Sequence, residues 1–438
     1  MIPSDKIISS KLTSSSLVFR LVGQGGAIPP DYNFLFNSLQ TTLPSSLTNV
    51  GATYTRAGTK YNLQNSLYVA YGANAFGTNY DVSEATYGYY SEVLATNTFT
   101  YSNDKSNAVW TKNQGAVATN ADTAINGLSS YKFTPNTNND KHYLRHSTVI
   151  PSGVETRVSE IVKASGYRYL AVIRNVATST VDALVFDLQD GVIFQVSTDY
   201  TNEKIENLGN GFYRISFTCN STIAGVRQPK LSIISNTPTT PVNSNNSNFA
   251  ADGTSGILFC NTQAETGGRA SSPIITTSST VTRAADVLSV PRANLTEMSD
   301  FLYTLIANYR TDIAPVGGGR YVLSLKDDVG DNVSNIYNDN FNGFVVASGG
   351  VVQYDRTIAN STATRTKAGM SLKTGTMLSS QNGVALDTSV GSPTMPISPT
   401  SLNIGHILSS LQTNGHIFSV KIITSAISQT ELDLETTL

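Results

Sequence analysis

Residues 185–219 hold the pattern that decides the fold. The stretch opens with Val185-Phe186-Asp187-Leu188 and closes with Phe212-Tyr213-Arg214-Ile215-Ser216-Phe217-Thr218-Cys219. In the closing run apolar and polar side chains alternate, which is the period of a strand with one buried face. The Asp190-Gly191 and Asn210-Gly211 pairs supply residues that tolerate the positive φ of tight turns. These features predict antiparallel sheet of the kind that builds β-sandwiches.

The composition favours the same fold class. Only 14% of the 438 residues are charged, the chain holds 21 tyrosines, and hydroxyl and amide side chains are abundant. Such a composition is typical of all-β extracellular, fibrous or virion proteins. The formal net charge of -2 gives no electrostatic reason to expect nucleic acid or an anionic membrane as a partner. The length predicts two or three domains.

The start of the chain and its two cysteines bear on where the protein works. Residues 1–8 lack the charged and then apolar pattern of a signal peptide, and no window approaches the ~20 apolar residues that span a bilayer. We therefore expect synthesis in a cytoplasm and no membrane insertion. Cys219 and Cys260 each lie in an apolar run, so they fit either a disulfide across a sheet or two buried thiols.

The first 95 residues divide into two parts. Residues 1–50 mix short apolar islands, such as Phe34-Leu35-Phe36, with glycine and proline, and such a piece cannot bury a core alone. They fit either an extended N-terminal arm that docks on another protein or one or two strands laid on the following domain. Residues 51–95 are rich in tyrosine and are interpreted as a lead-in or connector.

Residues 96–286 resemble a β-sandwich module of the carbohydrate-binding type that is common in structural proteins of tailed bacteriophages. Six segments match it in order, among them Leu208-Gly209-Asn210-Gly211-Phe212-Tyr213-Arg214 and the exit phrase Thr282-Arg283-Ala284-Ala285-Asp286. The resemblance implies a jelly-roll on a virion protein such as a tail fibre or head fibre. An insertion between Ala224 and Phe249 departs from the family pattern, and so does Ile257-Leu258-Phe259-Cys260-Asn261, where the family usually shows an aromatic-rich strand.

Residues 287–438 are interpreted as a second sandwich. Residues 301–309 fit a helix by apolar spacing or a strand by alternation, and we predict a strand. Leu402-Asn403-Ile404-Gly405-His406 and Asn414-Gly415-His416-Ile417-Phe418 resemble the end of concanavalin-like (laminin-G-like) sandwiches. Ser428 and Glu431 have the spacing of a capping box, which predicts a short terminal helix.

Metal ligands are sparse in the sequence. His142 and His146 are about 13 Å apart if they lie on a strand, and neither they nor His406 and His416 come with the Cys or Asp partners of a zinc site. Asp327, Asp328 and Asp331 offer oxygen ligands suited to calcium, but Asp and Gly are also what hairpin turns require. Calcium at this cluster is thus the one metal hypothesis, and no other cofactor is expected.

No catalytic constellation can be assembled from the sequence. A glycoside hydrolase needs two carboxylates across a sugar, and of the candidates Asp187, Asp190, Glu203 and Glu206, Asp190 falls in a turn and the two glutamates in a polar segment. Glycan binding needs exposed rings, for which Tyr167 and Tyr169 on one strand face are the candidates. Packing within the sheet is the alternative for both tyrosines, and Trp110 is expected in a core.

These observations predict an all-β chain of two consecutive antiparallel β-sandwiches (jelly-roll, lectin-like), preceded by the N-terminal docking arm, with sandwiches over residues 96–286 and 287–438. By the resemblance, the protein is a non-enzymatic virion structural protein that contacts other virion proteins through its arm and host-surface glycan through its sandwiches. A homo-oligomer, with a trimer favoured by analogy, is expected on the particle exterior. The alternatives are a purely architectural capsid or tail subunit and a polysaccharide depolymerase.

Overall fold

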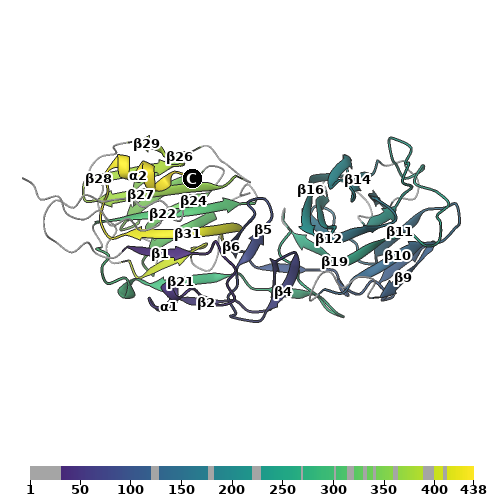
Figure 1. The fold of residues 1–438 in the computed structure, drawn as a ribbon, viewed down its shortest axis with the longest axis horizontal. Helices are drawn as coiled ribbons and strands as arrows, with labels where there is room; N and C mark the ends of the chain where they lie inside the picture. The colour runs from purple at the N-terminus through teal and green to yellow at the C-terminus, as the bar shows by residue number, and fades with distance from the viewer. Residues whose placement is uncertain are drawn as a thin grey trace, which may run out of the picture.

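The computed structural model describes residues 31–119, 128–175, 182–219, 228–267, 270–299, 302–312, 320–328, 333–338, 342–358, 364–387, 399–407 and 412–438. Strands dominate these residues, and the strands of each sheet pair antiparallel. The prediction of an all-β chain built from antiparallel sandwiches is confirmed. Figure 1 shows two β-sheet bodies side by side along the long axis of the molecule.

One body receives strands from both ends of the chain, and we call it the terminal sandwich. One of its sheets has the order β29-β28-β27-β22-β31-β6-β5, with β1 also paired to β31, and the other has the order β2-β21-β30-β23-β24-β25-β26. Buried apolar side chains from both sheets form one core cluster, as expected when alternate residues of each strand face inward. The strands and helices are β1 (Tyr32–Leu35), α1 (Ser45–Thr48), β2 (Thr53–Thr55), β5 (Asn79–Asp81), β6 (Thr86–Ser91), β21 (Val287–Pro291), η1 (Arg292–Asn294), β22 (Leu302–Thr311), β23 (Arg320–Lys326), β24 (Val333–Asn338), β25 (Asn342–Ser348), β26 (Val351–Ile358), β27 (Thr366–Lys373), β28 (Thr376–Gln381), β29 (Val384–Asp387), β30 (Ser401–Ile404), β31 (Gly415–Ile423) and α2 (Gln429–Thr436).

The other body lies between β6 and β21 in the sequence, and we call it the inserted sandwich. Its inner sheet, which faces the terminal sandwich, has the order β16-β17-β12-β19-β10-β9, and its outer sheet has the order β15-β14-β13-β18-β11-β8. Trp110 and the alternating residues of β17 belong to the core cluster between these sheets, as the sequence predicts. The strands are β8 (Trp110–Asn113), β9 (Gly115–Thr119), β10 (Tyr131–Pro135), β11 (His142–His146), β12 (Thr156–Ser165), β13 (Tyr169–Arg174), β14 (Leu184–Asp187), β15 (Val192–Gln195), β16 (Tyr200–Gly209), β17 (Phe212–Cys219), β18 (Pro229–Ile233) and β19 (Gly256–Thr266).

The N-terminal segment differs from a docking arm over residues 32–50. β1 pairs along its whole length with β31, from Tyr32 opposite Ile422 to Leu35 opposite Ser419. Phe34 and Phe36 are buried in the core of the terminal sandwich. The alternative interpretation, strands laid on a folded body, is therefore the correct one here, because two phenylalanine rings gain more from burial than from exposure on a free arm. Residues 1–30 lie outside the described residues.

The expected connector is likewise part of the fold. β2 pairs with β21, and β6 pairs with both β5 and β31, so residues 53–55 and 79–91 complete the terminal sandwich. The inserted sandwich thus interrupts the terminal one, whereas the sequence predicted a division at residue 286. Strand pairings between residues more than two hundred positions apart leave no local pattern in the sequence, which explains the difference.

Two short strand pairs join the sandwiches. β7 (Ala95–Asn97) and β20 (Val281–Arg283) pair where the chain leaves and re-enters the terminal sandwich. The hairpin of β3 (Lys60–Gln64) and β4 (Leu67–Tyr71) lies between the two bodies (Figure 1). Its Leu63 and Tyr68 share a buried cluster with Phe212 and Cys260 on the face of the inner sheet that points away from the inserted core. Apolar burial therefore holds the two bodies together.

Several local predictions are confirmed. Residues 302–311 form a strand, and Ser428 with Glu431 forms a complete capping box at the start of α2. Cys219 packs in the inserted core and Cys260 on the opposite face of the same sheet, and no disulfide joins them. Within the described residues, no helix is both long and apolar enough to cross a bilayer.

Candidate functional site

The two tyrosines predicted as glycan contacts are buried. The Tyr167 ring packs edge-on against Phe249, and its hydroxyl accepts a hydrogen bond from the Asp252 amide at 3.1 Å. Tyr169 is 8% exposed and lies in a cluster on the outward-facing side of the outer sheet. The alternative of packing within the sheet is therefore the better description of both rings, and neither offers an open face to a sugar.

The proline- and asparagine-rich insertion explains the burial of Tyr169, whereas Tyr167 belongs to the core between the two sheets. Val242 from the insertion packs against Tyr169, Ala171 and Val185 on the outward side of the outer sheet. Gln195 fixes the insertion there, because its amide donates to the Val242 carbonyl at 2.7 Å and accepts from the Val242 amide at 2.8 Å. The insertion thus covers part of the outer face of this sheet.

The edge strand β15 carries the exposed apolar surface of this region. Val192 and Phe194, at alternate positions of β15, are 48% and 38% exposed, and Val196, directly after the strand, is 62% exposed. The Phe194 ring leans on Tyr169, with 4.8 Å between ring centroids. One aromatic face is thus held rigidly from beneath and remains open to solvent above.

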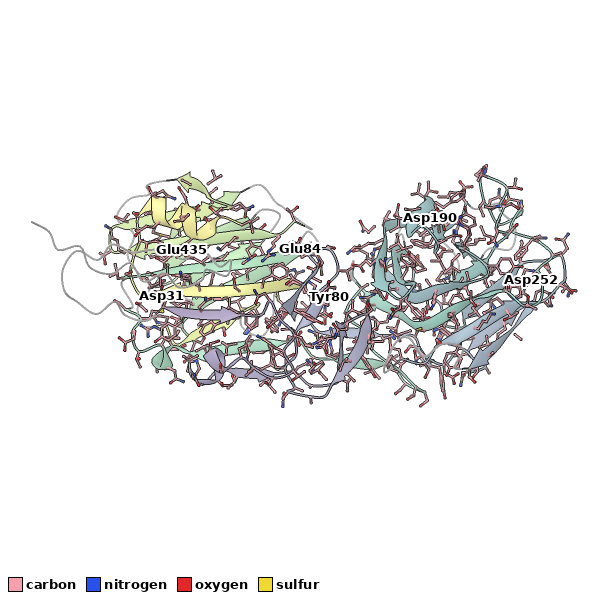
Figure 2. All side chains as sticks on the ribbon, viewed as in Figure 1. Asp31, Tyr80, Glu84, Asp190, Asp252 and Glu435 are labelled. Atoms are coloured by element: carbon pink, nitrogen blue, oxygen red, sulfur yellow. The ribbon has the colours of Figure 1, made fainter. Side chains whose placement is uncertain are left out.

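Charged groups border this apolar strip. Arg168 lies over the Tyr169 ring at 4.9 Å and pairs with both Asp187 and Asp190. The Asp190 side chain is 61% exposed in the turn between β14 and β15, on the rim of the inserted sandwich (Figure 2). We call Arg168, Asp190, Val192, Phe194 and Val196 the β15 patch. It combines a ring face, apolar edges and one accessible carboxylate.

Arg168 favours the ionised form of Asp187, which lies next to the patch. Burial alone would raise the pKa of Asp187, but the hydrogen bonds from Arg168 and from the amides of Gln189 and Asp190 hold that pKa below its ordinary value. Asp187 is therefore a fixed carboxylate that orients Arg168. An ionised, hydrogen-bonded carboxylate of this kind is an anchor and not a proton donor.

The predicted acidic cluster is only partly described. Asp327 and Asp328 follow β23, and Asp328 Oδ1 accepts a hydrogen bond from the Thr400 hydroxyl at 2.6 Å. Asp331 lies outside the described residues. No group of three or more His, Cys, Asp or Glu side chains in the described ranges is placed to hold a metal ion. Calcium at this loop stays a prediction.

Carboxylates with the properties of a general acid are not exposed in the part of the chain that the structure describes. Burial raises the pKa of Glu160 and of Glu265, but both side chains lie in the interior. Glu206 accepts a hydrogen bond from Lys204 at 2.6 Å, and although burial would raise its pKa, Lys204 and Arg214 lower it. Glycoside hydrolysis requires one accessible carboxylic acid beside a second carboxylate. The candidate carboxylates of the sequence do not form such a pair.

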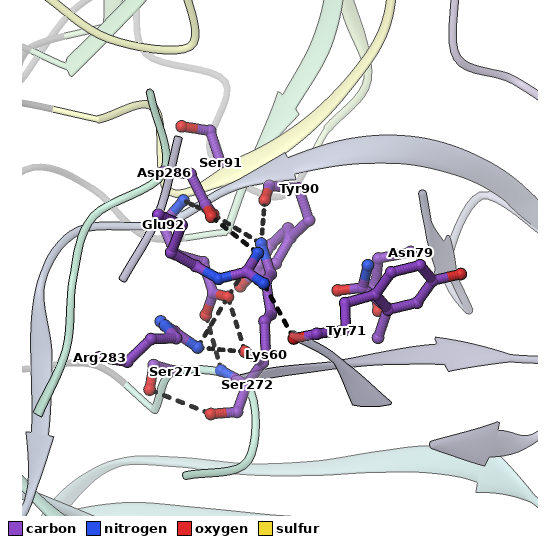
Figure 3. A network of polar contacts seen from close by, with 12 residues as sticks. Lys60, Tyr71, Asn79, Tyr90, Ser91, Glu92, Ser271, Ser272, Arg283 and Asp286 are labelled. Carbon is purple, nitrogen blue, oxygen red and sulfur yellow. Dashed lines mark hydrogen bonds and ion pairs between the residues drawn. The ribbon is translucent and has the colours of Figure 1, made fainter. Parts of the chain in front are cut away.

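The densest charged cluster is buried where the two sandwiches meet (Figure 3). Asp286 accepts hydrogen bonds from the Tyr54 hydroxyl and from Lys60 Nζ, each at 2.6 Å. Glu92 lies 3.2 Å from the same Lys60 and 3.1 Å from Arg283. We call Arg56, Lys60, Glu92, Arg283 and Asp286 the junction network, because Arg56 also lies 3.5 Å from Asp286.

The junction network is fully enclosed and therefore structural. The side chains of its members are at most 3% exposed. Burial would raise the pKa of Glu92, but Arg283, Lys60 and two hydrogen bonds from Ser272 reverse the effect, so the pKa lies well below its ordinary value. Buried charges that are paired in this way hold the elements that carry them in register.

The histidines are also structural. His146 Nδ1 accepts a hydrogen bond from the Thr148 amide at 3.1 Å, and Nε2 donates to the Thr100 carbonyl at 2.9 Å. The ring is therefore neutral, and its face stacks on Phe99. Burial lowers the pKa of His146 to about 4. His416 contacts Asp81 and Asn79 in the terminal sandwich, so none of these rings completes a zinc site within the described residues.

We expect the stability of the inserted sandwich to fall as the pH is lowered through the range set by His146. The folded pKa of about 4 lies below the ordinary 6.5, so between these values the proton binds mainly to the unfolded chain and stabilises it relative to the folded one. This one ring should remove about 2 kcal/mol of unfolding free energy between pH 7 and pH 5. Urea unfolding at each pH, followed by Trp110 fluorescence, measures the unfolding free energy. In His146→Gln the decrease between pH 7 and pH 5 should be smaller by this contribution. An equal slope in both proteins would contradict the prediction.

Comparisons with known proteins leave the family open. No family model and no curated protein matches the chain. Among solved structures, a carbohydrate-binding domain (CBM40) of a Ruminococcus gnavus IT-sialidase bound to alpha2,3 sialyllactose is 14% identical over 33% of this chain and 87% of its own, with a TM-score of 0.30. Domain 4 of the Geobacillus stearothermophilus arabinanase AbnA is 13% identical over 35% of this chain and 73% of its own, with a TM-score of 0.29. A Trypanosoma rangeli sialidase is 10% identical over 73% of this chain and 61% of its own, with a TM-score of 0.27.

Proposed function

We propose that this protein is a non-enzymatic structural protein of a tailed-phage particle that binds a host-surface glycan through the β15 patch. The virion setting rests on the resemblance of residues 96–286 to a phage module and on a composition poor in charge. The glycan role rests on one observation, the open Phe194 ring supported by Tyr169 and flanked by Arg168 and Asp190. Sugars pack their C–H faces on such rings while neighbouring polar groups bind their hydroxyls.

The fold suits presentation of this patch. The terminal sandwich and the junction network hold one side of the inserted sandwich, and β15 is an edge strand of its outer sheet. A rigid support lowers the entropy cost of binding, because the ring and the ion pair are already ordered. The partners would be other virion proteins and, by analogy with fibres, further copies of this chain in a homo-oligomer, with a trimer favoured. That residues 1–30 dock on other virion proteins stays a prediction.

The patch can be tested by binding. Phe194→Ala and Asp190→Ala should each weaken binding of the purified protein to a responding glycan on an array at least ~10-fold, about 1.4 kcal/mol. Val384→Ala is the matched control, because this exposed valine lies on an edge strand of the terminal sandwich. Binding that survives both patch substitutions would place the glycan site elsewhere. A protein that binds no host glycan would contradict the proposal.

One observation favours the alternative of a purely architectural subunit. Both broad faces of the inserted sandwich are covered in part, one by the insertion around Val242 and the other by the β3–β4 hairpin. In that case the β15 patch would bind a neighbouring virion protein. Phe194→Ala would then impair assembly of particles while the isolated protein gives no signal on a glycan array.

A further inference from the structure

A lysine and a glutamate face each other inside the inserted sandwich. On β12, Val158 and Val162 point into the core, and Glu160 lies between them on the same side of the strand. Lys105 reaches this place from the turn before β8. Both side chains are 0% exposed, and Lys105 Nζ lies 3.7 Å from Glu160 Oε2. The two residues therefore meet where water is excluded.

The hydrogen bonds of the pair define its chemistry. Lys105 Nζ donates to the Ser102 carbonyl at 2.5 Å and to the Cys260 carbonyl at 3.0 Å, and the Trp110 ring covers it at 4.5 Å. A neutral amine has two hydrogens, so both are used by these carbonyls and the lone pair remains. The Thr262 hydroxyl, on the neighbouring β19, donates to Glu160 Oε2.

The surroundings favour the uncharged forms of both groups. Burial lowers the pKa of Lys105 and raises that of Glu160, although each partner opposes the shift of the other. The separation of 3.7 Å is too long for the charge-assisted hydrogen bond that would compensate a buried ion pair. An uncharged lysine is a nucleophile, and an uncharged carboxylic acid is an acceptor of nucleophiles.

We propose that Lys105 and Glu160 condense after folding to an isopeptide bond that cross-links the turn before β8 to β12. Nζ attacks Cδ of Glu160, a C–N bond forms, and the C–O bond to the carboxyl hydroxyl breaks. One proton from Nζ leaves with that hydroxyl as water, relayed by the Thr262 hydroxyl. The reaction needs no oxidant, cofactor or other reactant, because the fold supplies both groups.

The geometry assists each part of this step. The Ser102 and Cys260 carbonyls hold the amine by its hydrogens and leave the lone pair unused, and the carboxyl group lies 3.7 Å away. Thr262 is paired with Glu160 across the sheet, so its hydroxyl stays in contact with the departing oxygen. Positioning of this kind replaces a bimolecular encounter by an intramolecular one. The amide that forms keeps one N–H for one of the two carbonyls.

The experiment measures the intact mass of the full-length protein in denaturant. We expect a mass lower than that of the sequence by one water molecule, and a proteolytic digest with one branched peptide that joins residues 105 and 160. Glu160→Gln should still react, with loss of one ammonia. Lys105→Met and Glu160→Ala should each have the mass of their sequence.

Controls distinguish the proposed bond between Lys105 and Glu160 from other reactions in which the protein loses water. Lys204 and Glu206 are 2.6 Å apart, but their side chains are 44% and 34% exposed to water, so the digest should hold no branched peptide from them. Thr262→Val should slow the reaction, so a mixture of linked and unlinked protein is expected soon after synthesis. Wild-type protein with the full mass of its sequence, or a water lost without the 105–160 branched peptide, would overturn the proposal. Both of these results are measured on the wild-type protein, so they do not depend on whether a variant folds.

Discussion

Asp286→Ala is expected to lower the free energy of unfolding by about 3–5 kcal/mol, the cost of breaking a buried ion pair from one side. Asp286 binds Lys60, Tyr54 and the Glu92 amide, and it lies near Arg56. Without the carboxylate, Glu92 is the one acidic group left in the network beside the three buried cations Arg56, Lys60 and Arg283. Their desolvation is no longer compensated, so the folded state loses more than the hydrogen bonds themselves.

Urea unfolding measures this change with two signals. Trp110 is the one tryptophan of the chain and reports on the inserted sandwich, whereas circular dichroism reports on both sandwiches. Because the junction network holds the two bodies in register, we expect both transitions to shift in Asp286→Ala. Lys204→Gln is the matched control, since its pair with Glu206 remains partly open to water, unlike the junction network, and should change stability by less than about 1 kcal/mol. Equal stability of Asp286→Ala and wild type would mean that the network does not stabilise the junction.

The local part of the fold could be predicted because it is encoded in neighbouring residues. The alternation in residues 212–219 and 302–311, and the Ser428 to Glu431 spacing, each specify one element without reference to the rest of the chain. The partner of a strand is not specified in this way. Phe34-Leu35-Phe36 shows a strand with one apolar face, but nothing in it indicates that the face belongs to the same core as residues 417–422.

In the candidate site, too, the local patterns could be read from the sequence, whereas the contacts between distant segments could not. Residues 167–169 do alternate in the sequence, but only the structure shows that Val242, from an insertion far along the chain, covers Tyr169. Val192, Phe194 and Val196 alternate as well, and this signal could have identified the exposed strip, had the edge position of β15 been known. Lys105 and Glu160 lie in segments without any common motif, so their meeting could not be predicted.

The junction network also bears on the proposed function. Its members come from residues 51–95, which the sequence analysis interprets as a connector, and from the end of the module at residues 282–286. The proposed function requires the β15 patch to be held in a fixed place, and a junction without a flexible linker serves this. Apolar contact around Phe212 and ionic contact around Asp286 together provide one.

Phe36→Ala should destabilise the terminal sandwich by about 3–5 kcal/mol, the usual cost of removing a phenylalanine from a packed core. Phe36 is 0% exposed, its ring lies 6.1 Å from that of Phe76 and 5.8 Å from that of Tyr89, and its amide donates to the Phe418 carbonyl. The substitution leaves a cavity among these rings that the surrounding sheets cannot fill by moving. Circular dichroism during urea unfolding measures the loss.

The neighbouring Leu35 provides the control. Leu35 is 45% exposed on the opposite side of β1, so Leu35→Ala should change the unfolding free energy by no more than about 0.5 kcal/mol. If residues 32–50 instead served as a docking arm, Phe36→Ala would leave the unfolding of the isolated protein unchanged and would weaken only its attachment to a partner. A large loss for Phe36 beside a small one for Leu35 follows only if β1 is a structural strand, since the two residues share every feature of an arm but differ in burial.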